Sequence, residues 1–236
     1  MLGIWGVGLA FGGTILVILM FITRQSWFTP PPVRFCIMLG FRAVGVRFEV
    51  KGAEHLDPKK SYMIVANHQS IMDIPALFNY LPGKLGFLGK KEVRNVPILG
   101  VGAEQMGMIF IDRKNREQAR KGTEKIKERL RQGMSFIVFP EGTRSDDGRL
   151  LPFKKGAFHI AYDVGASVVP VTIKNAYQIM PKRGCRVFPG VIHVYVHPPV
   201  DSTDYKSIEE LKVRVAEIVA SELEPELLIN YVPQPA

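Results

Sequence analysis

The sequence predicts an α/β fold in which a mixed, mostly parallel sheet is flanked by helices. Short apolar runs, such as residues 62–66 and 135–139, alternate with stretches that have helical periodicity. Strands that alternate with helices are typical of a parallel sheet covered on both faces. An uncharged, apolar run precedes this alternating part, and we expect it to form an N-terminal membrane-associating helical segment.

Size and composition favour one globular domain with an appended segment, because 47% of the 236 residues are apolar. Cys36 and Cys185 lie far apart without metal-ligand spacing, and we interpret both as free thiols in a reducing compartment. The net charge is +9, and residues 84–132 carry 13 Lys and Arg against 6 Asp and Glu. Such a surface suits anionic headgroups, phosphates or an acidic carrier protein. Nucleic acid is disfavoured because no helix-turn-helix, zinc or RNA-stacking signature accompanies the charge.

The N-terminal segment carries the membrane prediction. Residues 1–23 contain no charged side chain, and about 20 apolar residues can span a bilayer. Pro30-Pro31-Pro32 is expected to break any continuing helix, and residues 33–46 are expected to form an interfacial helix. Basic residues follow the apolar run, so the positive-inside rule places the rest of the chain on the cytoplasmic face of the cell membrane. Residues 1–46 are therefore the predicted anchor and 47–236 the predicted globular domain. A spanning helix and a two-helix hairpin in one leaflet both fit.

The elements of the globular part follow from local pattern. Residues 46–51 alternate, which predicts a half-buried strand with one wet face. The charged stretch 115–132 predicts a helix that Gly133 ends, and Ser207-x-x-Glu210 is a capping box that opens a C-terminal amphipathic helix. Further strands are expected at 84–88, 108–111, 167–173 (interrupted by Pro170) and 191–197, and further helices at 71–80 and 156–164.

The stretch from Asn67 to Asp73 lies between a buried strand and a helix. His68 is therefore at the carboxyl end of a strand, where ligands bind in open α/β sheets. A histidine there can titrate near neutral pH and move a proton. Asp73, in the first helical turn, can fix the tautomer of the imidazole and stabilise its cation. Ser70-x-x-Asp73 is also a capping box, in which Asp73 only satisfies backbone N–H groups, and the stretch alone leaves both interpretations open.

Four blocks in order resemble the glycerolipid acyltransferases, the family of the 1-acylglycerol-3-phosphate acyltransferases. The first is Asn67-His68-x4-Asp73. The others are Gly107–Arg113 (GMIFIDR), Phe139–Ser145 (FPEGTRS) and Val168–Val171 (VVPV). The match covers roughly residues 60–175, and the two ends of the chain match only in general character. The resemblance implies an acyltransferase domain that moves a fatty acyl group from an acyl carrier protein or coenzyme A thioester to 1-acylglycerol-3-phosphate. The product would be phosphatidic acid, in phospholipid biosynthesis.

Acyl transfer from a thioester to an alcohol needs a base for the hydroxyl, hydrogen-bond donors for the oxyanion and binding sites for both substrates. His68 would be the general base and Asp73 its orienting group. No Gly-x-Ser-x-Gly elbow is present, so direct attack by the acceptor hydroxyl is favoured over an acyl-enzyme. Backbone N–H groups around Gly142, or at the helix start after His68, are the candidate oxyanion donors. No cofactor is expected, and no metal, because His159, His193 and His197 are scattered.

The acceptor phosphate needs cations, and the family pattern assigns Arg113 and Arg144 to it. Arginine donates two hydrogen bonds at once to a phosphate. The structural alternative pairs each arginine with a carboxylate of its own block, Asp112 or Glu141. In the same block as Arg144, Glu141 is expected to bind acceptor hydroxyls or to brace Arg144, and Gly142 and Thr143 are expected in the same binding site. Lys90 is a further candidate phosphate ligand.

Three other functions fit part of this pattern. The acceptor could be glycerol-3-phosphate or a lysophospholipid with a larger headgroup, although the compact chain favours a small phosphate acceptor. The third is a non-enzymatic membrane module that binds anionic lipid through the basic stretch. Removing His68 and Asp73 distinguishes the module from an enzyme, because a binding module would keep its function. The acyl donor, the chain-length preference and the oligomeric state are not predicted.

Overall fold

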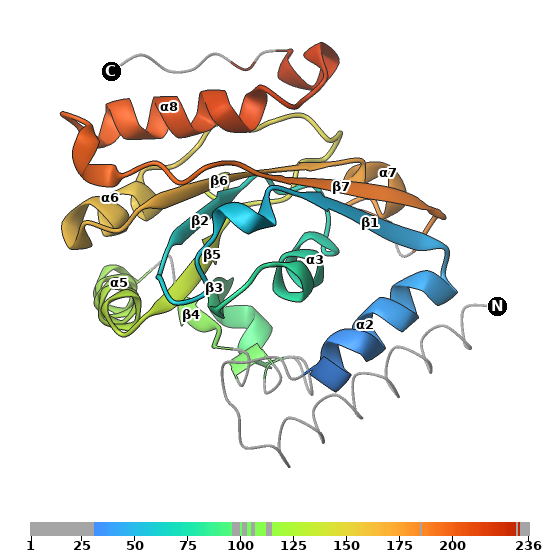
Figure 1. Ribbon diagram of the computed structural model, residues 1–236, viewed down its shortest axis with the longest axis horizontal. Coiled ribbons are helices and arrows are strands. Elements are labelled where there is room, and N and C mark those ends of the chain that lie inside the picture. The colour runs from blue at the N-terminus through green and yellow to red at the C-terminus, as the bar shows by residue number, and fades with distance from the viewer. Residues whose placement is uncertain are drawn as a thin grey trace.

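The computed structural model describes residues 31–95, 100, 103–104, 107–111, 115–184, 186–229 and 231. Within them, seven strands form one sheet in the order β1-β7-β6-β2-β5-β3-β4 (Figure 1). The strands are β1 (Val46–Lys51), β2 (Met63–Ala66), β3 (Lys84–Lys90), β4 (Ile109–Ile111), β5 (Met134–Val138), β6 (Val168–Lys174) and β7 (Gly190–Val196). The helices are α2 (Pro31–Ala43), α3 (Asp73–Tyr80), α5 (Arg116–Arg131), α6 (Gly156–Val164), α7 (Ala176–Ile179) and α8 (Ile208–Ala220).

Most strand pairs of the sheet are parallel, as predicted. β2 is parallel to β5 and β6, and β3 is parallel to β5 and β4. β7 is antiparallel to β6 and parallel to the edge strand β1. The carboxyl ends of β2 to β6 therefore meet at one edge of the sheet, which is where ligands bind in folds of this kind.

Helices cover both faces of the sheet (Figure 1). One buried cluster joins α3 and α7 to the sheet, and the other joins α5, α6 and α8 to its opposite face. The central strand β2 divides its side chains between them: Ile64 and Ala66 enter the first cluster, and Met63 and Val65 enter the second. This alternation is the period of two expected of a strand, and burial on both faces explains why β2 reads as a continuous apolar run.

Element boundaries agree closely with the sequence prediction. β1 and α6 have the predicted limits, and the others shift by one to three residues. The side chain of Asn115 caps α5 by accepting the N–H of Gln118 at 3.0 Å. At α8, Ser207 Oγ accepts the N–H of Glu210 at 3.1 Å, which confirms the predicted cap. The Glu210 carboxylate accepts the N–H of Lys206 at 2.9 Å, which completes a variant of the capping box.

Pro170 does not interrupt β6, contrary to the prediction. Val168, two residues before Pro170, exchanges backbone hydrogen bonds with Val200. The Pro170 carbonyl accepts the N–H of His197 at 3.0 Å. The missing N–H of Pro170 therefore faces the β7 side, where the ladder with β7 begins only at Val171. Proline is tolerated in this central strand because no ladder bond is lost there.

The helix predicted at residues 33–46 is α2, and it begins at Pro31. Proline fits the first turn of a helix, where its missing N–H has no helical partner. Phe35 and Leu39 of α2 are 60% and 57% exposed, and the Arg34 guanidinium reaches the carbonyl of Leu81 at 3.5 Å. Across the described ranges, no helix has both the length and the apolar character to cross a bilayer. The apolar run 1–23 itself lies outside the described residues.

Candidate active site

The loop between β2 and α3 carries His68, and Asn67 fixes its start. Asn67 Nδ2 donates to the carbonyl of Ile173 at 2.8 Å, and the N–H of Ile173 donates to Asn67 Oδ1 at 2.7 Å. The Asn67 side chain is 1% exposed and completes the pairing of β6 beyond the end of β2. This reciprocal pair holds the loop at the carboxyl edge of the sheet.

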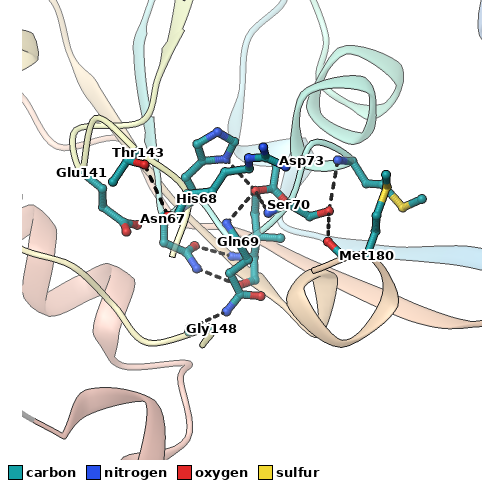
Figure 2. Close-up of polar contacts among 12 residues, drawn as sticks. Asn67, His68, Gln69, Ser70, Asp73, Glu141, Thr143, Gly148 and Met180 are labelled. Carbon is teal, nitrogen blue, oxygen red and sulfur yellow. Dashed lines mark hydrogen bonds and ion pairs between the residues drawn. The ribbon is translucent and has the colours of Figure 1, made fainter. Parts of the chain in front are cut away.

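His68 and Asp73 are in direct contact (Figure 2). His68 Nδ1 lies 2.8 Å from Asp73 Oδ2, and the side chains are 15% and 0% exposed. The same Oδ2 atom accepts the N–H groups of Gln69 and Ser70, both at 2.8 Å. An ionised carboxylate only accepts hydrogen bonds, so Nδ1 carries a proton and Nε2 is left to accept one. The capping and orienting interpretations of Asp73 therefore hold together, on one oxygen atom.

Phe139, which follows β5, stacks on the imidazole of His68. The ring centroids are 4.0 Å apart and the planes differ by 16°. The stack and the Asp73 carboxylate fix two directions of the ring, so its Nε2 edge has a defined orientation. Phe139 belongs to a block that resembles the family, but the sequence predicts no role for it, because a contact between residues 71 positions apart has no local signal.

Glu141 binds the backbone on the other side of His68. Its Oε1 accepts the N–H of His68 at 2.7 Å, and its Oε2 accepts the N–H of Leu151 at 3.3 Å. The side chain is only 3% exposed. Burial raises the pKa of the Glu141 carboxyl well above its usual value, although the two N–H groups act in the opposite direction. These contacts differ from the expected ones with acceptor hydroxyls or with Arg144.

A second residue of the same block also binds the backbone of His68. The N–H of Ser145 donates to the carbonyl of His68 at 2.9 Å. Next along the loop, Gln69 Nε2 donates to the carbonyl of Gly148 at 3.0 Å. Both backbone groups of His68 are thus held by residues 141–145.

The expected phosphate ligands are only partly placed by the structure. Arg144 is half-buried, and its guanidinium makes no ion pair or hydrogen bond with another described residue, so the alternative pairing with Glu141 is not formed. Lys90 is the last residue of β3, and its side chain lies outside the described part. Arg113 also lies outside the described residues.

Most of the expected oxyanion donors already have partners. The N–H of Gly142 (φ 75°) donates to the carbonyl of Phe139 at 3.0 Å, and the N–H groups of Gln69 and Ser70 bind Asp73. Thr143 is exposed, and neither its N–H nor that of Arg144 has a partner among the described residues. Among the described residues, these two amides and that of Ile71 therefore remain available near His68.

The comparisons with known proteins agree on one family. A family model described as Acyltransferase matches residues 47–174, which is more than half of the chain. The chain belongs to the acyltransferase family. The matched region holds the whole His68 loop and the 139–145 block, so the predicted family is confirmed through the segments that form the site.

Relatives of this acyltransferase come from distant organisms. The 1-acyl-sn-glycerol-3-phosphate acyltransferase alpha of Bos taurus is 36% identical over 163 residues, which cover 69% of this chain and 57% of the relative. The 1-acyl-sn-glycerol-3-phosphate acyltransferase of Saccharomyces cerevisiae is 40% identical over 156 residues, covering 61% of this chain and 50% of the relative. The chain thus spans about half the length of these curated relatives.

A solved structure resembles this acyltransferase over most of its length. The crystal structure of the 1-acyl-sn-glycerophosphate acyltransferase from Thermotoga maritima superimposes with a TM-score of 0.72 at 30% identity. The similarity covers 92% of this chain and 90% of that one. It therefore extends beyond residue 174, into the C-terminal part that the family model does not match.

The site of the acyltransferase lies at the sheet edge and apart from the hollow that the described residues form elsewhere. That hollow, of about 710 Å³, lies between α2 and β1, and neither His68 nor Asp73 lines it. Of the three histidines considered as metal ligands, His193 pairs with Glu49 at 3.1 Å, and His197 Nε2 is 2.9 Å from Thr172 Oγ1. Within the described residues, no group of three or more metal-binding side chains converges.

Proposed function

We propose that this acyltransferase moves a fatty acyl group from an acyl thioester to the free hydroxyl of 1-acylglycerol-3-phosphate, producing phosphatidic acid. One observation carries the proposal: His68 is oriented by Asp73 at 2.8 Å at the carboxyl edge of the sheet, with Nε2 left to accept a proton. The names of the relatives from Bos taurus, Saccharomyces cerevisiae and Thermotoga maritima support the acceptor.

In the proposed reaction, His68 Nε2 takes the proton of the acceptor hydroxyl while its oxygen attacks the thioester carbonyl. Asp73 stabilises the imidazolium that forms. The tetrahedral intermediate then collapses, the carbon–sulfur bond breaks, and the imidazolium returns the proton to the thiolate. The net result is one ester formed, one thioester broken and one thiol released. The N–H groups of Thr143 and Arg144 are the proposed donors to the oxyanion, because they have no other described partner.

The Arg144 guanidinium is the proposed ligand of the acceptor phosphate, with Arg113 and Lys90 as further ligands from the sequence pattern. A half-buried guanidinium without a partner among the described residues suits a phosphate, since its planar fork donates two parallel hydrogen bonds. We assign Glu141 to positioning His68 and not to the acceptor, because both of its oxygens accept backbone N–H groups. Gly142 and Thr143 belong to the turn that presents Arg144.

The acyl donor is proposed to be a thioester of an acyl carrier protein or of coenzyme A. Both donors are acidic, and α5 carries exposed cations at Arg120, Lys121, Lys125 and Arg131. Exposed carboxylates of Glu117, Glu124 and Glu128 lie among these cations, so α5 carries an excess of positive charge and not charge of one sign. Such an excess raises the rate of encounter with an acidic partner, in a manner that depends on salt. No cofactor takes part in the proposed chemistry.

Membrane association is proposed to come from residues 1–46, with the acyltransferase domain, residues 47–236, on the cytoplasmic face. Its lipid acceptor and product would lie in the same leaflet as α2, which exposes Phe35 and Leu39. We expect the full chain to remain with membranes through washes of high salt and of alkaline pH. Release by salt alone would show that electrostatic contacts, and not an apolar segment, hold the protein.

The decisive experiment supplies the purified full chain with lysophosphatidic acid and each acyl donor in turn, and measures phosphatidic acid. General-base catalysis contributes roughly 10²–10⁴-fold, so His68→Ala is expected to lose at least about 100-fold in kcat. His159→Ala, at an exposed histidine of α6, is the matched control and should keep its rate. A His68 variant with more than about a tenth of the wild-type rate would remove the imidazole from the mechanism. If the protein acylates glycerol-3-phosphate but not lysophosphatidic acid, the proposed acceptor is wrong.

A further inference from the structure

The loop between α7 and β7 contacts both segments of the site. Ser70 Oγ, two residues after His68, donates to the carbonyl of Met180 at 2.8 Å (Figure 2). On the other side, Lys182 Nζ and Arg183 Nε lie 3.0 and 3.3 Å from the carboxylate of Asp146. Asp146 follows Ser145, whose N–H binds His68. The α7–β7 loop therefore lies against both segments of the candidate site.

Two large apolar side chains are exposed on these segments. Ile71 is 48% exposed and directly follows Ser70, which is bound to Met180. Phe188 is 49% exposed, and its N–H donates to the carbonyl of Ile179 at 2.9 Å. Ile179 and Met180 are consecutive, so both exposed side chains belong to segments that are bound to the same end of α7. Exposed apolar residues that gather beside a site mark an interaction surface.

The same loop carries an excess of positive charge. The side chain of Arg183 is 87% exposed, and Arg186 is exposed as well. Lys182 and Arg183 share one carboxylate, that of Asp146, so this pair of cations keeps a net positive charge. Aliphatic and aromatic side chains flanked by long basic ones suit a lipid–water interface, where the cations reach headgroups and the apolar groups enter the acyl boundary.

We propose that one surface patch inserts into the surface of an anionic bilayer and holds the candidate site against the leaflet. This entrance patch consists of Ile71, Arg183, Arg186 and Phe188. This contact is distinct from the N-terminal anchor, since it is made by the catalytic loop and the α7–β7 loop. The lipid nature of the acceptor rests on the proposed function, but the contact itself does not. An acidic carrier protein fits the cations, whereas the paired apolar side chains favour a bilayer.

A direct test places a reporter in the patch and measures its depth without any turnover. The full chain carries Phe188→Trp in a background in which its two tryptophans are removed by Trp5→Phe and Trp27→Phe. Vesicles contain phosphatidylcholine and phosphatidylglycerol, with brominated acyl chains. Tyr162→Trp is the control, because Tyr162 is 37% exposed on α6, which lies at the opposite end of the molecule from α7 (Figure 1).

We expect the emission of the Phe188→Trp protein to shift to shorter wavelength and to be quenched by the brominated lipids. The control protein, with Tyr162→Trp, should show neither effect. Replacing both cations, Arg183→Gln with Arg186→Gln, should weaken the quenching on anionic vesicles. Absence of quenching at position 188 overturns the proposal. A spectral change with an acidic acyl carrier protein, but not with vesicles, would make the patch a protein-docking surface and would equally overturn it.

A kinetic test uses matched isoleucines. Ile71→Ser and Ile229→Ser remove side chains of the same type that are 48% and 50% exposed. With lysophosphatidate in vesicles, Ile71→Ser is expected to raise the apparent KM about tenfold, as loss of a half-buried apolar contact with the bilayer implies. With a short-chain acceptor below its micellar concentration, kcat should stay within about twofold of wild type. Equal effects of Ile71→Ser and Ile229→Ser would contradict the proposal, and Phe188→Ser repeats the test outside the catalytic loop.

The two proposals fail in different ways. Quenching at position 188 without product from lysophosphatidic acid would retain the bilayer contact and reject the proposed acceptor. Product formation without quenching would retain the acceptor and reject the contact.

Discussion

Replacing Glu141 with alanine distinguishes a carboxylate that positions His68 from one that binds the acceptor. In the structure, Glu141 is 3% exposed and accepts the N–H groups of His68 and Leu151 at 2.7 and 3.3 Å. The substitution leaves both part-buried N–H groups without this partner, and each such loss costs about 1–3 kcal/mol where water cannot replace the carboxylate. The free energy of unfolding should therefore fall by roughly 2–6 kcal/mol. The lower end is expected, because the cost of burying the carboxylate is also removed.

The kinetic effect should appear in kcat. Without Oε1, one of the two backbone contacts that hold the His68 peptide is lost, and displacement of a catalytic group by about 1 Å can cost on the order of 100-fold in rate. We expect kcat to fall by about 100-fold, while the acceptor KM changes by less than about threefold. Steady-state kinetics with varied acceptor, together with urea denaturation, measures both quantities.

Asp147→Asn is the matched control for Glu141→Ala. Asp147 is an exposed carboxylate of the same loop, and it accepts hydrogen bonds from Ser145 Oγ and the N–H of Arg149, both at 3.1 Å. Because it does not contact His68, kcat should change little. A Glu141→Ala enzyme that keeps its kcat but needs at least about tenfold more acceptor would refute the positioning argument, since that pattern belongs to a lost ground-state contact.

Three further predictions concern the same residues. Asp73→Asn should leave the fold intact, because the amide oxygen can take the place of Oδ2 and accept the same N–H groups. It should lower kcat by at least about 100-fold, because a neutral amide does not stabilise the imidazolium as a carboxylate does. Circular dichroism with kinetics checks this, and a near-normal rate would contradict it. Arg144→Lys keeps the charge but loses the planar fork, so the acceptor KM should rise while the donor KM stays constant; an unchanged acceptor KM would place the phosphate elsewhere. Burial raises the pKa of Glu141 above its ordinary 4.5, so the folded state holds that proton more tightly. The stability that this proton provides is fully present below pH 4.5 and is lost as pH rises through the folded pKa. Glu141→Gln should therefore gain stability relative to wild type as pH rises. If the urea midpoints of the two proteins change in parallel with pH, this prediction is wrong.

The fold could be predicted because its elements have local signals. β1 alternates from Val46 to Lys51 and is half-buried as expected, and α6 keeps its predicted limits because Gly165 (φ 63°) ends it. The exception is α7, whose four residues, Ala176–Ile179, are too few for a helical period. It is held by tertiary contacts, such as that of Ser70 with Met180, which are 110 residues apart.

The candidate site was predictable only where its partners are neighbours in sequence. The pair of His68 and Asp73 is five residues apart, so one strand end and one helical turn bring the two together. Contacts that cross the fold had no such signal. Phe139 stacks on the imidazole, and Glu141 binds the backbone of His68 across 73 residues. Residue type indicated a polar contact for Glu141, but the sequence could not show which group it meets.

The C-terminal part of the chain supports the site from outside the matched family region. The N–H of Leu150 donates to the carbonyl of Leu227 at 3.0 Å, and the adjacent N–H of Leu151 binds Glu141. Burial raises the pKa of the Tyr231 hydroxyl to about 12, and the negative charges of Glu141 and Glu217 add to the increase. Tyr231 is therefore close enough to Glu141 for an electrostatic interaction. Leu227 and Tyr231 also pack against the cluster that α8 shares with β2.

A continuous path of contacts therefore runs from the C-terminal segment through Leu150 and Glu141 to the peptide of His68. Residues 175–231 lie outside the family model, yet they hold the site from two sides. Met180 binds the loop that carries His68, and Leu227 binds the loop that carries Glu141. Hydrogen-bonded groups in such a network have few alternative arrangements, so we expect loss of either contact to change the orientation of His68. The matched blocks contain His68, Asp73 and Glu141, and the C-terminal part binds the two loops that carry them.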